Sequence, residues 1–185
     1  MLNTYTNLNE FISVYDNALD PGICDTLISF FENNVDAQER CDYDGRPNFQ
    51  QLNLSNLSSK INDIHNQVIN QLFEYGEKYH QFIGNDVFPE EFLIENVRIK
   101  RYNPGGIDRF DTHVDVRDHV SCRRFLAFLW YLNDVEIGGD TVFKDLVIKP
   151  QKGKLIVFPP LWLFPHRGES PISGTKYIMS SYLLY

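Results

Sequence analysis

The sequence is poor in cysteine, with three residues, Cys24, Cys41 and Cys122, spread far apart over 185 positions. An odd number without a CxxC pair excludes a disulfide framework and a cysteine-based zinc site, so we expect reduced thiols. No apolar run approaches the ~20 residues that cross a membrane. The chain does not open with a basic segment followed by an apolar run, so no signal peptide is indicated. Together these absences predict a cytoplasmic protein without a membrane partner.

Positive charge is also in deficit. Seventeen Lys and Arg residues stand against 25 Asp and Glu, giving a formal net charge of −8. Such an acidic balance argues against a nucleic-acid partner, whose binding depends on neutralising phosphates. Aromatic residues, in contrast, are abundant: the 14 Phe and 10 Tyr favour a β-rich interior. The length suits one domain, and nothing in the sequence indicates an oligomeric state.

Helical signals lie in the first half of the chain. Asp20-Pro21 has the pattern of an N-cap followed by proline at the first helical position. Residues 35–57 are polar and predict a loop with a short strand at 49–54. A second helix is expected after a cap at Ser58 or Ser59, because apolar residues then recur at intervals of three and four: Ile61, Ile64, Val68, Leu72, Tyr75, Tyr79 and Phe82.

The second half predicts short strands separated by turns, over residues 92–101, 110–116, 124–133, 155–158 and 176–185. Helices first and strands second indicate an α+β, mainly β fold. We expect a double-stranded β-helix, that is, a jelly-roll or cupin-like core buttressed by N-terminal helices. The prediction is a single domain over 1–185, with 1–90 as a helical support region and 91–185 as the jelly-roll core.

A histidine and a carboxylate stand two positions apart at His113 and Asp115, and His166 follows on a later loop. In a β-strand, residues two apart project from the same face, so one strand can direct both side chains to one point. Two histidines and one carboxylate form the facial triad of non-haem Fe(II) oxygenases. The sequence therefore predicts an iron site at these three residues, although an HxD triplet alone also occurs by chance.

Lys176 opens the last predicted strand and shares one face with Ser180. A buried lysine needs an anionic partner. A dicarboxylate bound to the metal by one end could offer its other carboxylate to Lys176, helped by the Ser180 hydroxyl. Tyr102 and Tyr131 are hydroxyl candidates for the same pocket. The competing interpretations are a solvated lysine at a strand start and two ordinary core tyrosines.

Over roughly Val97 to Tyr185 the chain resembles the prolyl 4-hydroxylase-like branch of the Fe(II)/2-oxoglutarate-dependent dioxygenases. The motifs that carry the resemblance are Arg101-Tyr102-Asn103-Pro104-Gly105, His113-Val114-Asp115, Trp130-Tyr131-Leu132-Asn133, Gly138-Gly139-Asp140-Thr141-Val142-Phe143, Lys152-Gly153 and His166 followed by Gly174-Thr175-Lys176-Tyr177. Three positions differ from the usual residues of relatives: Phe110 replaces a tyrosine, Ala127 a threonine and Tyr182 a tryptophan. These differences bear on the prolyl substrate more than on the iron chemistry.

The resemblance implies Fe(II) held by His113, Asp115 and His166, with 2-oxoglutarate and O2 as co-substrates and ascorbate as a reductant. Lys176 would bind the distal carboxylate of 2-oxoglutarate, and Tyr102 and Tyr131 would touch the same molecule. Arg124 matches an arginine near the substrate entrance; the alternative is a solvated charge at a strand start. The implied reaction converts 2-oxoglutarate to succinate and CO2 while a C–H bond is hydroxylated.

Three hypotheses about function remain open from the sequence. The first is a hydroxylase of a prolyl or other residue in a protein or peptide. The second is the same chemistry on a free amino acid or another small molecule. The third is a non-catalytic jelly roll that binds a ligand. Nucleic-acid dealkylases of the superfamily carry two arginines after the distal histidine, whereas here Arg167 is followed only by Lys176.

Overall fold

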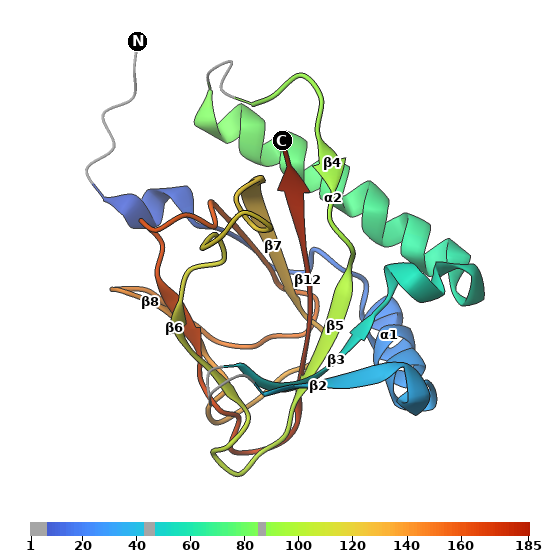
Figure 1. Ribbon diagram of the computed structural model, residues 1–185. Helices are drawn as coiled ribbons and strands as arrows, with labels where there is room; N and C mark the ends of the chain where they lie inside the picture. Colours follow the sequence, from blue (N-terminus) through green and yellow to red (C-terminus); the bar gives the residue numbers. More distant parts are fainter. Residues whose placement is uncertain (1–6, 43–46, 85–87) are drawn as a thin grey trace.

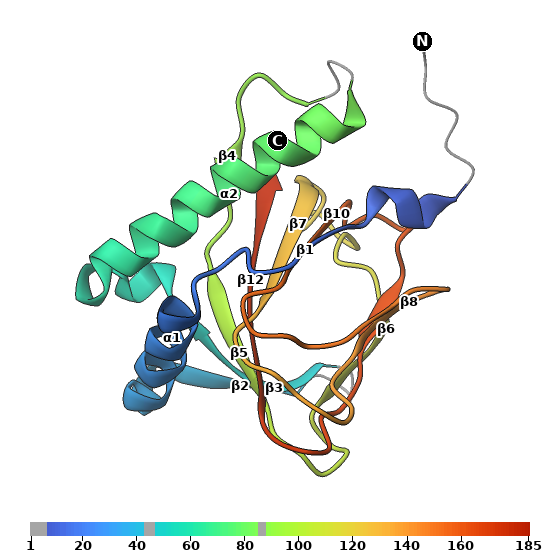
Figure 2. The same ribbon diagram turned by 180° about the vertical axis from the view of Figure 1, so that it is seen from behind.

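Two helices cover one side of a strongly bent antiparallel sheet (Figures 1 and 2). The computed structural model describes residues 7–42, 47–84 and 88–185. The helices are α1 (Pro21–Asn33) and α2 (Asn62–Ile83), and short 3-10 helices occur at Leu8–Phe11, Val35–Ala37 and Ser55–Lys60. In the described part of the chain, no helix is both long and apolar enough to span a membrane.

The helix ends show where sequence signals suffice. Asp20 caps α1 as predicted, since its carboxylate accepts hydrogen bonds from the backbone N–H groups of Gly22 and Ile23. The predicted serine cap of α2 is wrong. Ser58 and Ser59 lie inside the preceding 3-10 helix, and α2 starts after Ile61 without a side-chain cap. The helix α2 is therefore stabilised by the packing of its apolar face rather than by an N-terminal cap.

The sheet rolls round a cavity. Its strand order is β1-β10-β7-β12-β5-β3-β6-β11-β8-β9, with β2 paired to β3 and β4 paired to β12. The strands are β1 (Ser13–Tyr15), β2 (Gln38–Asp42), β3 (Pro47–Asn53), β4 (Leu93–Ile94), β5 (Arg98–Tyr102), β6 (Arg109–His113), β7 (Arg124–Tyr131), β8 (Thr141–Phe143), β9 (Val147–Ile148), β10 (Leu155–Phe158), β11 (His166–Gly168) and β12 (Lys176–Leu184). This is the mainly β, jelly-roll-like architecture that the sequence predicted, with helices on one face.

The segment predicted as a loop at 35–57 is a hairpin. β2 and β3 pair from Gln38↔Leu52 to Asp42↔Asn48; residues 43–46 lie outside the described residues. Along the edge of β3 opposite β2, residues 50–53 pair with β5 and residues 47–48 pair with β6. The short strand predicted at 49–54 corresponds to β3, whereas β2 was missed, because both strands carry mostly polar residues and their periodicity is weak. Strands from the first half of the chain thus complete the sheet around the cavity.

Each face of the sheet has its own apolar core. The outer core lies between the helices and the sheet, and it includes Leu27, Phe31, Leu72, Trp130 and Met179. The inner core lines the roll, and it includes Tyr102, Tyr131, Phe143, Phe158 and Ile178. Alternation along β12 explains the division, because Met179 faces the helices while Ile178 faces the cavity. The inner face is the one on which the candidate site residues lie.

Candidate active site

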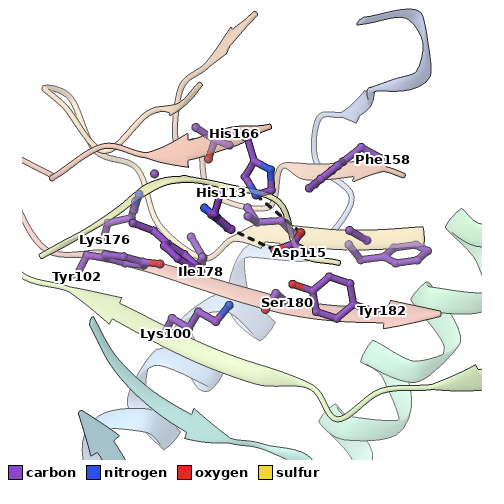
Figure 3. A pocket seen from close by; sticks show the side chains of 16 residues that line it. Lys100, Tyr102, His113, Asp115, Phe158, His166, Lys176, Ile178, Ser180 and Tyr182 are labelled. Atoms are coloured by element: carbon purple, nitrogen blue, oxygen red, sulfur yellow. Dashed lines mark ion pairs between the residues drawn. The ribbon is translucent and has the colours of Figure 1, made fainter. Parts of the chain in front are cut away.

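The three predicted metal ligands converge in the roll (Figure 3). His113 on β6 and His166 on β11 are direct cross-strand partners. Their Nε2 atoms lie 3.4 and 3.8 Å from the two oxygens of Asp115, and the potential ligand atoms all fall within 4.8 Å of one another. One expectation was wrong: β6 ends at His113, so Asp115 lies just beyond the strand rather than on its face.

Backbone carbonyls orient both imidazoles. The Nδ1 atom of His113 lies 2.8 Å from the Asp111 carbonyl oxygen, and that of His166 lies 3.1 Å from the Phe164 carbonyl oxygen. A carbonyl only accepts, so each Nδ1 carries the proton and each Nε2 presents a lone pair to the centre. Burial lowers the pKa of His166, which keeps the imidazole neutral and able to bind a metal.

Asp115 is held ionised and in place. Burial alone would raise its pKa, but His166 and His113 outweigh that effect and hold the pKa below its usual range. Arg124 donates a hydrogen bond to the Asp115 carbonyl oxygen at 2.9 Å and pairs through two nitrogens with Glu95, at 2.6 and 2.7 Å. The arginine expected near the substrate entrance therefore lies behind a metal ligand and fixes the backbone that carries it.

A small cavity of about 40 Å³ adjoins the three ligands, and Lys176 lines it (Figure 3). The lysine is 1% exposed and its Nζ donates hydrogen bonds to the carbonyl oxygens of Gly139 and Glu169. Nζ also lies 4.6 Å from the centre of the Tyr102 ring. Burial lowers the pKa of Lys176 to about 7. Among the described residues, no carboxylate lies within ion-pairing distance of this ammonium group, so it can accept an anion from a ligand.

The other predicted residues occupy different parts of the cavity. Tyr102 lines it beside Lys176. Tyr131 donates a hydrogen bond to the Thr141 hydroxyl at 2.6 Å, and Thr141 rather than Tyr131 lines the space. Ser180 lies four residues along β12 from Lys176, about 13 Å at the usual strand rise. The expected assistance of Ser180 to Lys176 does not fit this spacing, and Figure 3 places Ser180 beside Tyr182 instead.

Among the polar residues that line the cavity, Thr141 and Lys100 were not predicted from the sequence. Thr141 stands within the quoted Gly138 to Phe143 motif, but only the structure shows that it lines the cavity. Lys100 lines the cavity two residues before Tyr102 on β5. The alternation of strand faces could have found it, because any residue two before Tyr102 must share its face.

The Gly138–Gly139 turn supports the Lys176 end of the cavity and gives a testable prediction. Gly138 has φ +75°, and a Cβ atom there would lie 2.6 Å from the Ser170 carbonyl oxygen. We expect Gly138→Ala to lower the free energy of unfolding by about 1–3 kcal/mol, measured by urea denaturation. Gly174→Ala is the matched control, since no atom lies within 4 Å of its added Cβ. Equal stability of the two variants would contradict this prediction.

Two imidazoles and one carboxylate, with an open cavity beside them, define a non-haem Fe(II) centre. The sequence profile of the 2OG-Fe(II) oxygenase superfamily matches residues 97–184. Residues 97–184, which carry the triad and Lys176, belong to this superfamily. As in the superfamily, the triad holds Fe(II), and 2-oxoglutarate is the co-substrate. The converging Nε2 lone pairs and the ionised carboxylate fit the metal.

Solved structures share the fold at low sequence identity. The viral collagen prolyl hydroxylase of Paramecium bursaria chlorella virus 1, solved with 2-oxoglutarate, superposes with a TM-score of 0.69 at 21% identity, over 94% of this chain and 95% of that chain. A prolyl-4-hydroxylase of Pseudomonas putida gives 0.63 at 15% identity, over 94% and 92%. A prolyl hydroxylase of Trichoplax adhaerens, bound to a hypoxia-inducible-factor peptide, gives 0.69 at 12% identity, over 95% and 84%. Among curated protein sequences none matches this chain.

Proposed function

We propose that this oxygenase hydroxylates a prolyl or other residue in a protein or peptide, with succinate and CO2 as co-products. The observation that carries the proposal is the placement of the metal triad and the unpaired Lys176 in one cavity. A ligand with two carboxylates can then satisfy both. Structural neighbours named as prolyl hydroxylases, one of them bound to a peptide, support the substrate class.

In this proposal each residue of the chain has a defined task. Lys176 binds the distal carboxylate of 2-oxoglutarate, as a buried ammonium binds an anion. Tyr102 shapes the same end of the cavity, while Tyr131 acts through the hydroxyl of Thr141. Bound iron and 2-oxoglutarate supply oxygen activation coupled to oxidative decarboxylation. The chain orients the target C–H bond and excludes competing reactions.

The resemblance places Arg124 near the substrate entrance, and we include this role in the proposal as a secondary one. Glu95 and the Asp115 carbonyl oxygen engage its nitrogens, and its guanidinium carbon lies 4.0 Å from the centre of the Tyr182 ring. We therefore assign Arg124 the positioning of Asp115 as its main task.

A substrate screen tests the proposed function. The protein with Fe(II) and 2-oxoglutarate is incubated with proline-rich peptides and with free proline, and both succinate and mass are measured. We expect a peptide to stimulate succinate formation and to gain one oxygen atom, about 16 mass units. His113→Ala should abolish both signals. Stimulation by free proline alone would transfer the function to small molecules, and failure of 2-oxoglutarate to bind would overturn the proposal.

The buried Lys176 predicts a pH dependence of co-substrate binding. Its pKa of about 7 in the free protein is lowered by burial, which Asp140 and Glu169 partly offset. A bound carboxylate favours the charged form and raises this pKa. Because 2-oxoglutarate selects the protonated lysine, we expect its affinity to fall above pH 7, by up to about tenfold per pH unit, with uptake of a proton on binding. Calorimetry in two buffers measures the proton, and Lys176→Arg should remove the dependence.

A further inference from the structure

A second lysine, Lys100, lines the cavity apart from Lys176. It lies on β5, two residues before Tyr102, and pairs in register with Ile178 of β12. Figure 3 shows its side chain directed away from Lys176, toward Ser180 and Tyr182. The cavity thus has a lysine at each end, with the metal triad alongside.

The Lys100 ammonium group lacks an anionic partner. Among the described residues it makes no hydrogen bond or ion pair, and its recorded contact is with the Phe49 ring, 5.3 Å from Nζ to the ring centre. Burial lowers the pKa of Lys100 to about 8; Asp115 opposes this, and Arg98 and Arg124 add to it. The group is therefore still mainly charged at neutral pH, and the half-buried side chain is only partly solvated.

The charges of the loaded site leave Lys100 uncompensated. Fe(II) and Asp115 together carry one positive charge, and 2-oxoglutarate brings two negative charges. The positive charge of Lys176 balances the one negative charge that is left. Nearby, Arg98 and Arg124 share the single carboxylate of Glu95, which cannot also neutralise Lys100. One further anion would balance this end of the cavity.

A hydroxyl group lies beside this cation. Ser180 and Tyr182 share the cavity face of β12 and line the same space as Lys100. The Tyr182 hydroxyl is hydrogen-bonded to the Asp115 carboxylate, whereas the Ser180 side chain, in a residue only 6% exposed, faces Lys100 (Figure 3). An ammonium group with a neighbouring hydroxyl matches the donors that bind a carboxylate.

We propose that Lys100, with the hydroxyl of Ser180, binds a carboxylate of the substrate close to the carbon that is hydroxylated. This inference rests on the proposed function and narrows it. The substrate is then a residue next to an acidic side chain, or a free amino acid held by its own carboxylate. A neutral residue in neutral surroundings leaves Lys100 unpaired and binds poorly.

Direct observation of the Lys100 side chain tests this site without turnover. The protein is labelled with ¹³C at lysine Cε, loaded with Zn(II) and saturating 2-oxoglutarate at pH 7, and the Lys100 signal is identified by its loss in Lys100→Arg. Acetate is then titrated as the carboxylate probe and acetamide as its neutral match. We expect acetate to shift the Lys100 signal saturably and acetamide to leave it in place. The signal of the exposed Lys78 on α2 is the internal control.

Two further pairs of probes distinguish the source of the carboxylate. The first is L-proline against L-prolinamide, and the second is a capped Pro-Asp peptide against its Pro-Asn counterpart. Tighter binding of L-proline identifies a free amino acid as the substrate, and tighter binding of the Pro-Asp peptide identifies an acidic peptide. The preference for the acid over its amide should be about tenfold or more in the parent protein and in Lys100→Arg, and it should vanish in Lys100→Met.

The outcomes separate this inference from the proposed function. If no acid shifts the Lys100 signal while 2-oxoglutarate still binds, the inference is wrong and the proposed function stands. If 2-oxoglutarate itself shifts the signal and acetate does not, Lys100 belongs to the co-substrate site, and the inference is equally wrong. If 2-oxoglutarate does not bind at all, the proposed function fails first.

Discussion

Asp115→Ala is expected to abolish iron binding and succinate formation together. The substitution removes the only anionic ligand of the triad and leaves two imidazoles. Loss of residues behind a ligand typically costs 10–100-fold in metal affinity, so loss of the ligand itself should cost more than about 100-fold. Affinity is measured by titrating Mn(II) into the oxygen-free protein, and activity by succinate.

Asp111→Ala is the matched control in the same segment. Its carboxylate pairs with Arg109 at the surface, and its side chain is 42% exposed. The hydrogen bond to His113 comes from the backbone carbonyl of residue 111, which alanine retains. This variant should therefore bind metal like the parent protein. Equal metal affinity in Asp115→Ala and the parent would remove Asp115 from the centre.

Lys176→Met should raise the dissociation constant for 2-oxoglutarate by about 10–150-fold, the range for a hydrogen bond to a charged group, while iron still binds. Methionine keeps much of the length and volume of lysine but offers neither charge nor donor. Binding is measured by calorimetry with Mn(II) in the absence of oxygen. Lys176→Arg should keep part of the affinity because it retains the charge.

Lys176→Met should weaken 2-oxoglutarate binding but stabilise the free protein. Without co-substrate the Lys176 ammonium is buried without an anion, and burial lowers its pKa to about 7. Between pH 7 and the ordinary lysine pKa the unfolded chain binds more protons, so this lysine destabilises the free protein progressively as pH falls. Lys176→Met should therefore melt at higher temperature than the parent at pH 7. If Lys176→Met melts at a lower temperature than the parent and binds 2-oxoglutarate normally, Lys176 stabilises the fold and does not bind the co-substrate.

The metal ligands were predictable because their chemistry is local. His113 and Asp115 stand two apart, and His166 and Lys176 follow in a recognisable order. The sequence did not show that Asp115 lies beyond the strand, or that Arg124 binds its carbonyl oxygen. Nor did it show that Glu95 neutralises this arginine across 29 positions of sequence. Such long-range pairs leave no periodic pattern.

The hairpin and the second lysine were missed for a related reason. β2 and β3 carry polar residues such as Glu39, Gln50 and Gln51, so their strand character comes from pairing with neighbours. Lys100 was given no role from the sequence, although it stands two residues before Tyr102 and therefore shares its strand face. The position of β5 between β12 and β3 places that face toward the roll.

The pairing of β3 sets the minimum size of a working unit. This strand joins β5 to β6 and so closes the wall between the two halves of the roll. The superfamily match begins only at residue 97. A fragment trimmed to that boundary would leave unpaired the edges of β5 and β6 that β3 covers, and such edges promote self-association. We therefore expect that residues 97–184, which match the superfamily, do not fold correctly alone. Expression should keep the residues that precede them.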